Sequence, residues 1–288
     1  MDSQWTSDAF KSRISDYSSR KRFEAGSPND REIEAYSYHI SNHFRGNLQG
    51  KKALVLGLTP ELRAMLHDFG MSVICIDQNQ DAIALFRDWL PLDRTVDENI
   101  VEGDWMNLED YLDEPIDVVV GDGVFGNILS LQGHRTLLNK IEKILNNRGI
   151  CVFRKILIPE NFSVQEYEVK KLIKRHRSGE MDDAEFGFAM RIWGLKDTAF
   201  NENKFLLDNN YSFSIFRQMY RDGLLNDDEI AAIERYYFGG INLITPQAIW
   251  EELLTDSGFE FESFPLSGKD WYAYYPIFGC VRRSYSCC

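Results

Sequence analysis

Short runs of aliphatic and β-branched residues alternate with longer amphipathic stretches between residues 51 and 155. The apolar runs suit strands buried on both faces, and the stretches between them have the spacing of helices. This alternation predicts parallel strands joined by right-handed crossovers. The predicted strands and helices, in chain order, are 53–57, 60–69, 72–77, 79–90, 99–102, 116–121, 135–146 and 149–155.

The segments on either side of this alternation follow other patterns. Ser27-Pro28-Asn29-Asp30 is a helix-start signal, and the residues after it are apolar at helical spacing. Thr245-Pro246 starts a further helix, and two strands near 259–282 are expected to form a terminal antiparallel hairpin. Between them lies an aromatic-rich region of helices and turns. Its predicted helices are 160–176, 182–200, 212–225 and 226–239.

The expected fold class is α/β, with a doubly wound, mostly parallel sheet and an antiparallel final strand. An N-terminal helix and a helical insertion are added to it. Four segments follow from the pattern. They are an N-terminal helical cap (1–48), a ligand-binding α/β core (49–158), a helical insertion (159–242), and a final helix and hairpin that complete the sheet (243–288). The insertion is either a mobile lid over a substrate or a rigid subdomain with its own aromatic core.

Three acidic residues follow three consecutive strand runs. Asp77 follows SVICI, Asp104 follows NIVEG and Asp122 follows DVVVG. In open α/β sheets, ligands bind at the carboxyl ends of the strands, so these side chains should face one crevice together with Gly57. Asp also caps helices and fills turns, which is the alternative for each residue taken singly. A ligand that bears hydroxyls, amines or positive charge is predicted.

The loop after the first strand narrows the choice of ligand. It reads LGLTPELR, so Gly57 stands alone where a dinucleotide site has GxGxxG, and no GK[ST] follows. An adenosine-like ligand without a phosphate tolerates such a loop. Asp77 lies about 20 residues after Gly57, where a carboxylate can accept both ribose hydroxyls. Nicotinamide cofactors share that spacing, so an oxidoreductase stays an alternative that the missing glycines disfavour.

These residues resemble the motifs of the class I S-adenosylmethionine (SAM) dependent methyltransferases. LVLGLTPE resembles the first motif, with TPE in place of its later glycines. ICIDQN, EGDW, VVGDGVFGN and GICVFRK resemble the second to fifth. The resemblance covers roughly 50–155 and the final hairpin. It implies that Asp77 binds the ribose, that Asp104 and Trp105 meet the adenine, and that Asp122 lies beside the methionine part. The cofactor-binding residues it implies are Gly57, Leu58, Thr59, Asp77, Gln78, Asp104, Trp105, Asp122, Gly123 and Val124.

Composition sets limits on partners and location. The net charge of −13 argues against a nucleic-acid binder, which needs a positive surface, and the basic stretch 170–177 is expected to be a solvated face. No apolar run approaches the length of a membrane helix, and the N-terminus has no apolar signal core. Five cysteines, an odd number, without a Cys/His pattern favour free thiols in the cytoplasm and no metal site. Nothing in the sequence indicates the oligomeric state.

Methyl transfer is a displacement in which the cofactor carries the reactivity and the protein aligns the partners. A general base is needed only if the acceptor arrives protonated. His134 is the best single candidate for a base, with a histidine bonded to backbone at a helix start as the alternative. Asp122 is a second candidate, with a structural or cofactor contact as the alternative. Arg22, Phe23 and Tyr36 are candidates for a lid over the crevice.

We therefore predict a SAM-dependent methyltransferase that acts on a small or medium-sized, partly apolar organic molecule. The alternative from another class is a catalytically inactive sensor or scaffold that binds SAM or a nucleoside. The lone glycine of the first loop and the lack of an evident base favour that alternative. Product formation from labelled SAM would separate the two.

Overall fold

A computed structural model describes residues 11, 14–16, 20–90, 97–160, 162–237 and 239–283. Its centre is a seven-stranded sheet in the order β13-β14-β7-β6-β3-β4-β5. Strand β14 pairs antiparallel with both of its neighbours, β13 and β7. The other pairs of the sheet, β7–β6, β6–β3, β3–β4 and β4–β5, are parallel. The strands are β3 (Lys52–Leu56), β4 (Ser72–Asp77), β5 (Glu98–Glu102), β6 (Ile116–Asp122), β7 (Leu145–Arg154), β13 (Phe259–Phe264) and β14 (Ile277–Arg282). The expected mostly parallel sheet with an antiparallel final strand is confirmed.

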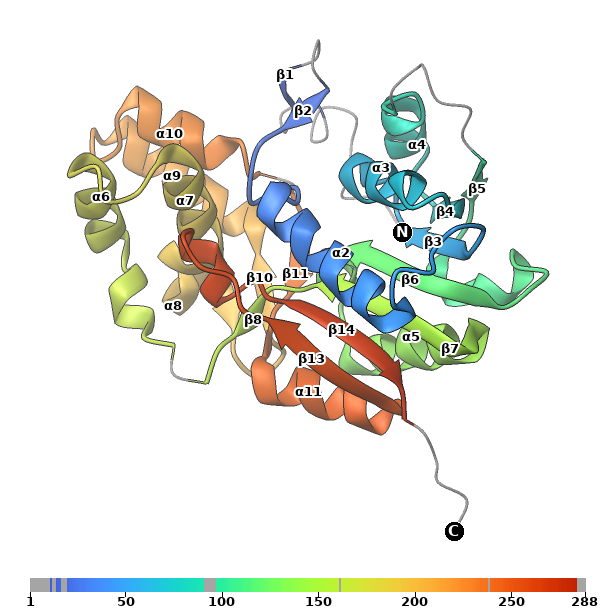
Figure 1. Cartoon of the computed structure of the whole chain (residues 1–288). Coiled ribbons are helices and arrows are strands. Elements are labelled where there is room, and N and C mark those ends of the chain that lie inside the picture. Colours follow the sequence, from blue (N-terminus) through green and yellow to red (C-terminus); the bar gives the residue numbers. More distant parts are fainter. Residues whose placement is uncertain are drawn as a thin grey trace.

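Helices cover both faces of the sheet, as the apolar runs on its central strands require (Figure 1). On one face, α2 (Asp30–Phe44), α3 (Pro60–Asp68) and α4 (Gln80–Phe86) pack on side chains such as Val55 and Val120. On the other, α5 (Leu131–Ile144) and α11 (Gln247–Asp256) pack on side chains such as Leu56 and Val119. Neighbouring residues of one strand thus enter two different cores, because strand side chains alternate in direction.

The insertion between β7 and α11 is more broken than its sequence predicted. The expected helix over 160–176 consists of a short turn, η3 (Val164–Tyr167), and α6 (Val169–Arg177), because Glu168 has extended backbone angles. The expected helix over 182–200 consists of α7 (Asp183–Ala189), a π-helical turn η4 (Met190–Gly194) and α8 (Lys196–Ala199). Two further helices match their predictions more closely, α9 (Asn209–Arg221) and α10 (Asp227–Glu234).

Small sheets that the sequence did not predict tie the insertion together. Strand β10 (Leu206–Asp208) pairs with β9 (Phe200–Asn201) and β11 (Ile241–Leu243). Strand β8 (Leu157–Ile158) pairs with β12 (Thr245–Pro246), which joins the two ends of the insertion beside the main sheet. A short pair, β1 (Ile14–Asp16) and β2 (Lys21–Arg22), precedes α2. These pairs run only two or three residues, too short to show a period-2 pattern.

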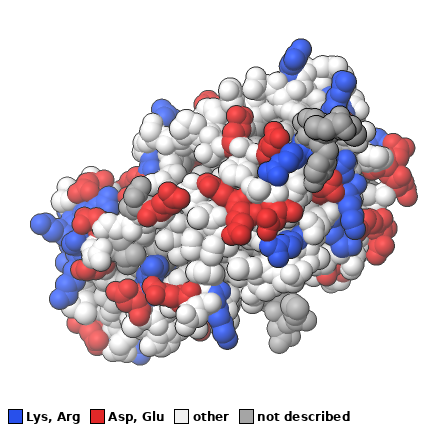
Figure 2. Space-filling model, turned by 90° about the horizontal axis from the view of Figure 1, so that it is seen from below, with Lys and Arg blue, Asp and Glu red and all other residues white. Residues whose placement is uncertain are grey.

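Four further features of the described residues are the surface charge, the length and apolarity of the helices, the grouping of side chains that can ligate a metal, and the cysteines. The face drawn in Figure 2 mixes acidic and basic side chains, with acidic ones gathered near its middle. Within the described residues, no helix has the length and apolarity to cross a membrane. The same residues contain no group of three His, Cys, Asp or Glu side chains placed to hold a metal ion. Cys75, Cys151 and Cys280 are buried free thiols.

Candidate functional site

A cavity of about 200 Å³ lies at the carboxyl edge of the sheet, where the parallel strands β3, β4 and β6 end. The N-terminal segment before α2 and the insertion supply its other walls. Eight of the ten residues that the sequence assigned to ligand binding line this cavity. They are Gly57, Leu58, Thr59, Asp77, Gln78, Trp105, Asp122 and Gly123. The parallel strands bring them together because all of these strands end at the same edge.

At one end of the cavity, Gly57, Asp77 and Trp105 form a compact group. Gly57 has a φ of +100°, and a Cβ there would lie 3.7 Å from Oδ2 of Asp77 and 4.0 Å from the Trp105 ring. Glycine therefore suits this position for its backbone angle and leaves the space beside the carboxylate open. The Trp105 indole N–H donates to the carbonyl of Ile76 at 2.6 Å, which fixes the ring plane. The group offers a carboxylate beside a flat apolar surface.

Asp77 is a partly buried carboxylate, and one backbone hydrogen bond stabilises its charged form against the effect of burial. Its Oδ1 accepts a hydrogen bond from the backbone N–H of Asn79 at 2.8 Å. Burial raises the pKa of Asp77 to about 6, and the Asn79 hydrogen bond opposes this rise. At neutral pH the side chain is mostly ionised and can accept from two ligand hydroxyls.

Two residues that the sequence assigned to the ligand lie outside the cavity lining. The Asp104 side chain is exposed and accepts from the backbone N–H of Met106 at 2.9 Å, so it caps the turn η1 (Trp105–Asp110). Val124 is buried in the core below η2 (Val124–Asn127). Asp104 thus caps a turn with Oδ1, in the same way that Oδ1 of Asp77 accepts from Asn79, and its contact with an adenine stays a prediction. The Val124 side chain lies against Gly121, and the assignment of Val124 to the ligand also stays a prediction.

Asp122 belongs to a buried ionic network centred on Arg154. Nε and Nη2 of Arg154 donate to the two Asp122 oxygens at 2.7 and 3.1 Å, and Nη1 donates to Glu32 at 2.5 Å. The Trp271 indole N–H donates to the same Glu32 oxygen at 3.2 Å. Both Asp122 oxygens thus accept charge-assisted hydrogen bonds from one guanidinium, which holds this carboxylate in the wall of the cavity. The network joins β6, β7, α2 and the segment before β14.

Tyr275 connects this network to the cavity. Its hydroxyl lies 3.4 Å from Oδ1 of Asp122, and the Arg154 guanidinium lies 4.2 Å from the centre of its ring. Burial and the Asp122 charge raise the pKa of the Tyr275 hydroxyl well above its ordinary value, so it stays a proton donor. Gly123, with a φ of +66°, leaves room for this hydroxyl, because a Cβ at Gly123 would lie 2.9 Å from it.

The insertion contributes a second buried guanidinium, that of Arg191, which lines the cavity and is 5% exposed. Its Nε donates to Oδ1 of Asn209 at 3.2 Å and its Nη2 to Oδ1 of Asn242 at 2.6 Å. Asn242 in turn donates to the carbonyl of Gly126 at 3.1 Å. Burial lowers the pKa of Arg191 to about 9, so the side chain is still charged at neutral pH. The insertion is thereby tied to the loop that follows β6.

The N-terminal segment closes the cavity from above. Arg22, Ala25 and Gly26 line it, and Arg22 forms a bidentate ion pair with Glu61 in the first turn of α3. Of the three lid candidates, only Arg22 reaches the cavity. Tyr36 is fully buried and donates to the carbonyl of Gly121 at 2.9 Å. Phe23 is absent from the cavity lining and packs beneath the Arg235 guanidinium, 4.7 Å away.

His134 has no access to the cavity, and its assignment as a general base is corrected. The residue is fully buried, and its Nε2 lies 2.6 Å from the carbonyl of Phe125 and 3.0 Å from that of Ile128. Burial and the nearby Lys155 ammonium lower the pKa of His134 to about 3. The neutral ring donates from Nε2 to one or both carbonyls. His134 therefore fixes the loop after Asp122 and takes no proton from a substrate.

Sequence reasoning missed Glu32, Arg154, Tyr275, Arg191 and Asn242. One signal was present, because Arg154 and Lys155 follow directly on the apolar run GICVF and so place two charges at the end of a buried strand. The other residues lie on helices, a loop and the short strand β11, and no local pattern fixes the positions of these elements in space.

The sequence matches no protein-family model, and it matches no curated protein sequence. Solved structures with a similar fold are numerous. The CcbJ methyltransferase from Streptomyces caelestis superposes with a TM-score of 0.55 at 12% identity, over 97% of this chain and 100% of that one. Magnesium protoporphyrin IX methyltransferase from Synechocystis PCC 6803 with bound SAM gives 0.50 at 11% identity, over 96% and 90%. A protein described as a putative Zn-dependent alcohol dehydrogenase from Rhodobacter sphaeroides gives 0.51 at 13% identity, over 96% and 98%.

Proposed function

Because the chain has the fold of the class I SAM-dependent methyltransferases, we propose that it binds SAM in the cavity at the sheet edge and transfers the methyl group to a small acceptor. The observation that carries this proposal is the group of Gly57, Asp77 and Trp105. It places a carboxylate beside an indole ring at a loop that lacks the features of a phosphate site. That combination suits a nucleoside with free ribose hydroxyls.

In this proposal Asp77 accepts the two ribose hydroxyls and the Trp105 ring lies along the adenine. The methionine part lies toward the loop of Gly57 to Thr59 and toward Asp122 and Gly123. SAM supplies an activated methyl group on a positively charged sulfur when it is bound. The protein holds the two partners in line and keeps water out. The N-terminal segment with Arg22 and the insertion with Phe188 and Arg191 supply that closure.

A nicotinamide cofactor suits this site less well than SAM does. A dinucleotide places its pyrophosphate at the N-terminus of the helix after the first strand. Here that first turn carries Pro60 and the Glu61 carboxylate, which forms an ion pair with Arg22. The loop has a single glycine, so its backbone lacks the close approach that GxGxxG gives a pyrophosphate. An oxidoreductase is therefore disfavoured by the backbone of this loop.

The acceptor is small to medium-sized and partly apolar, since Ile156, Phe188, Leu243 and Ile244 line the part of the cavity next to the insertion. No general base is assigned. Asp122 is held by Arg154, His134 is buried away from the cavity, and Tyr275 is a donor. The acceptor atom should therefore be nucleophilic without deprotonation by the protein.

The test is a calorimetric titration of S-adenosylhomocysteine (SAH) into the wild type, Asp77→Ala and Asp104→Ala. Asp77→Ala should weaken binding by about 30- to 1000-fold, because losing both charge-assisted hydrogen bonds to the ribose should cost roughly 2–4 kcal/mol in total. Asp104→Ala tests the adenine contact separately: it should weaken SAH binding if Asp104 accepts from the adenine amine, and it should leave binding unchanged if Asp104 only caps its turn. Equal binding by Asp77→Ala, or tight binding of NAD by the wild type, would overturn the proposal. Methyl transfer from labelled SAM then separates an enzyme from a sensor that only binds.

A further inference from the structure

We propose that a second pocket, at the opposite edge of the sheet from the cavity, binds a small molecule that carries a phosphate group. This basic pocket lies between the last turn of α2, the start of β7 and the end of β14, and it encloses about 650 Å³. The inference goes beyond the proposed function and does not depend on it. It rests on the charge of the lining, on the contacts that fix the walls, and on two guanidinium groups without an acidic partner.

The basic pocket lies at the amino ends of the parallel strands. Lys51 directly precedes β3, Arg148 lies near the start of β7, and Arg282 ends β14, which runs antiparallel to β7. Figure 1 shows α2 and β14 ending on the side of the molecule away from the insertion. The basic pocket and the cavity at the carboxyl edge share no lining residue. A ligand in the basic pocket is therefore separate from one bound in the cavity.

The lining of the basic pocket carries charge of one sign. Five of its side chains bear a basic group, and no Asp or Glu among the described residues belongs to it. The five are His43, Arg45, Lys51, Arg148 and Arg282. The whole chain has a net charge of −13, so a lining without an acid departs from the rest of the molecule. Cations gathered around a concave surface attract small anions to it.

Hydrogen bonds fix one wall of the basic pocket, where α2 meets β7. Nε2 of the His43 ring donates to the carbonyl of Arg148 at 2.9 Å. The backbone N–H of Arg148 donates to Oδ1 of Asn146 at 2.8 Å. These contacts hold the Arg148 backbone at the end of α2 and leave its guanidinium unengaged.

Lys51 and Arg282 form the other walls, and acidic residues outside the lining partly neutralise them. The Lys51 ammonium lies 3.6 Å from Oδ1 of Asp117 and 4.4 Å from the centre of the Phe44 ring. Nε of Arg282 forms an ion pair with Oε1 of Glu142 at 3.0 Å. Both side chains are thus held in place, and each adds only part of its charge to the pocket.

Arg45 and Arg148 provide the charge that is left for a ligand. Both side chains are exposed, and neither forms an ion pair or a hydrogen bond with the described part of the chain. A phosphate dianion has three oxygens, so two guanidinium groups can each donate to it in a bidentate pair. A carboxylate has two oxygens, and one guanidinium occupies both. Two free guanidinium groups in one pocket therefore favour a phosphate.

The experiment titrates the full chain at low ionic strength with inorganic phosphate and with phenyl phosphate, and phenol is the neutral counterpart of the ester. Calorimetry and the ³¹P resonance of each probe measure binding. We expect the wild type to bind at least one phosphate probe and not phenol, and added salt should weaken this binding because exposed charges are screened. Tighter binding of phenyl phosphate identifies an ester as the ligand, and tighter binding of inorganic phosphate identifies the free ion. Both orders support the inference.

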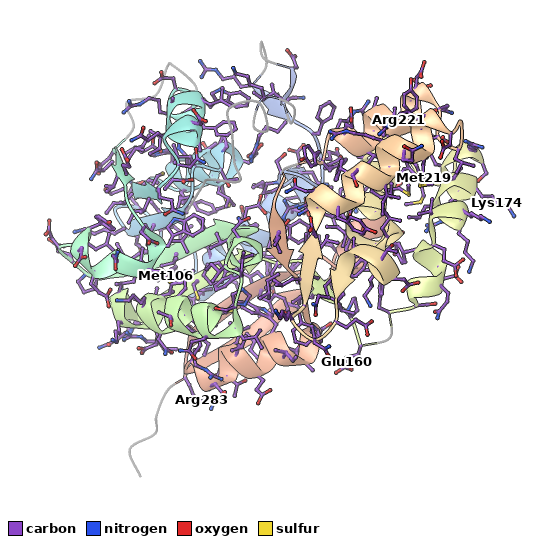
Figure 3. The ribbon with its side chains drawn as sticks, turned by 180° about the vertical axis from the view of Figure 1, so that it is seen from behind. Met106, Glu160, Lys174, Met219, Arg221 and Arg283 are labelled. Carbon is purple, nitrogen blue, oxygen red and sulfur yellow. The ribbon has the colours of Figure 1, made fainter. Side chains whose placement is uncertain are left out.

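Arg45→Gln and Arg148→Gln should each weaken phosphate binding by roughly 3- to 10-fold, and the double variant by at least about 10-fold. Both residues are exposed, so the variants keep the core intact. The matched control is Arg221→Gln, since Arg221 is an exposed arginine at the end of α9. Figure 3 shows it on the opposite side of the molecule from Arg283, which follows Arg282 of the basic pocket. This control should bind phosphate as the wild type does.

Three results would overturn the inference. The first is a wild type that binds neither phosphate probe, including one that binds poly-glutamate instead, since the basic pocket would then be a docking surface for an acidic protein. The second is equal phosphate binding by the wild type and the double variant. The third is competition between phosphate and SAH, which would place the phosphate in the cavity at the other edge of the sheet. None of these results changes the test of SAH binding at Asp77.

Discussion

Asp77 ends β4 and Asp122 ends β6, the two strands on either side of β3, yet the two carboxylates have different partners. Asp77 faces the cavity with one backbone hydrogen bond, and burial raises its pKa to about 6. Asp122 gives both oxygens to Arg154. The first carboxylate is available to a ligand, whereas the second holds the wall of the site together. A strand-end acid is therefore interpretable only with its partners in view.

Asp77→Asn should stabilise the ligand-free protein while it weakens SAH binding. The variant keeps an oxygen for the Asn79 amide and removes a carboxylate that burial disfavours. The rise of the pKa from 3.8 to about 6 corresponds to at most about 3 kcal/mol. Because the folded protein holds this proton more tightly, wild-type stability falls relative to the variant as the pH rises from 3.8 to about 6, and the gap is constant above that.

Urea unfolding of both proteins at pH 4.5, 5.5, 7 and 8 measures this difference. The free energy of unfolding of Asp77→Asn should exceed that of the wild type most at pH 7 and 8. Parallel curves over the whole range would contradict a raised pKa at Asp77.

At the scale of elements, the Arg154 network joins α2, β6 and β7 through groups far apart in sequence. Arg154→Met leaves Glu32 and Asp122 without their shared guanidinium, so it should cost roughly 3–5 kcal/mol of stability. Glu32→Gln leaves the Arg154–Asp122 pair in place and should cost only about 1–2 kcal/mol. Chemical denaturation of both variants shows which substitution lowers the free energy of unfolding more. A larger loss for Glu32→Gln than for Arg154→Met would show that the helix cap of Glu32, and not the ion pair, dominates.

The elements that sequence predicted well are those whose pattern is local. The runs before Gly57, Asp77 and Asp122 are continuous and apolar, because those strands are buried on both faces. Glu168 breaks a predicted helix although its side chain suits helices, and β9 to β11 are too short for a periodic signal. Tertiary contacts determine the structure of these segments, and the helix or strand propensity of their residues does not predict it.

The residues of the site also divide into those with a local sequence pattern and those that only tertiary packing places. Gly57, Asp77 and Trp105 were found because strand ends converge at one edge whatever else the fold contains. Arg191 and Tyr275 come from segments more than 30 residues beyond the last core motif, and only packing brings them to the cavity. Asp104 could not be assigned from sequence alone, because a strand-end acid can cap the next turn as well as face a ligand, and the two uses look alike in sequence.

At the scale of the whole molecule, the cavity is lined by two segments, the N-terminal segment and the insertion, and in the proposed function they face different ligands. Hydrogen exchange should separate them. SAH alone should protect the amides of residues 20–29, since Arg22, Ala25 and Gly26 line the cavity. In the proposed function, residues 160–240 should gain further protection only when SAH and an acceptor-like ligand are both present, because the insertion would then close over the acceptor.

Mass spectrometry of exchanged peptides under the three conditions makes this comparison. If residues 160–240 are fully protected in the free protein and no ligand changes them, the insertion is a rigid subdomain. Its aromatic residues then serve as core, and the acceptor enters beside the N-terminal segment.

The position of β14 in the sheet also has a consequence for biosynthesis. This strand lies between β7 and β13, and the residues just before it supply Trp271 and Tyr275 to the Arg154 network. On the ribosome, β7 emerges more than 100 residues earlier than β14 and waits as an open sheet edge. The ligand site therefore cannot be complete before β14 has been synthesised. It depends on the pairing of strands far apart in sequence, and contacts of that kind form slowly in folding.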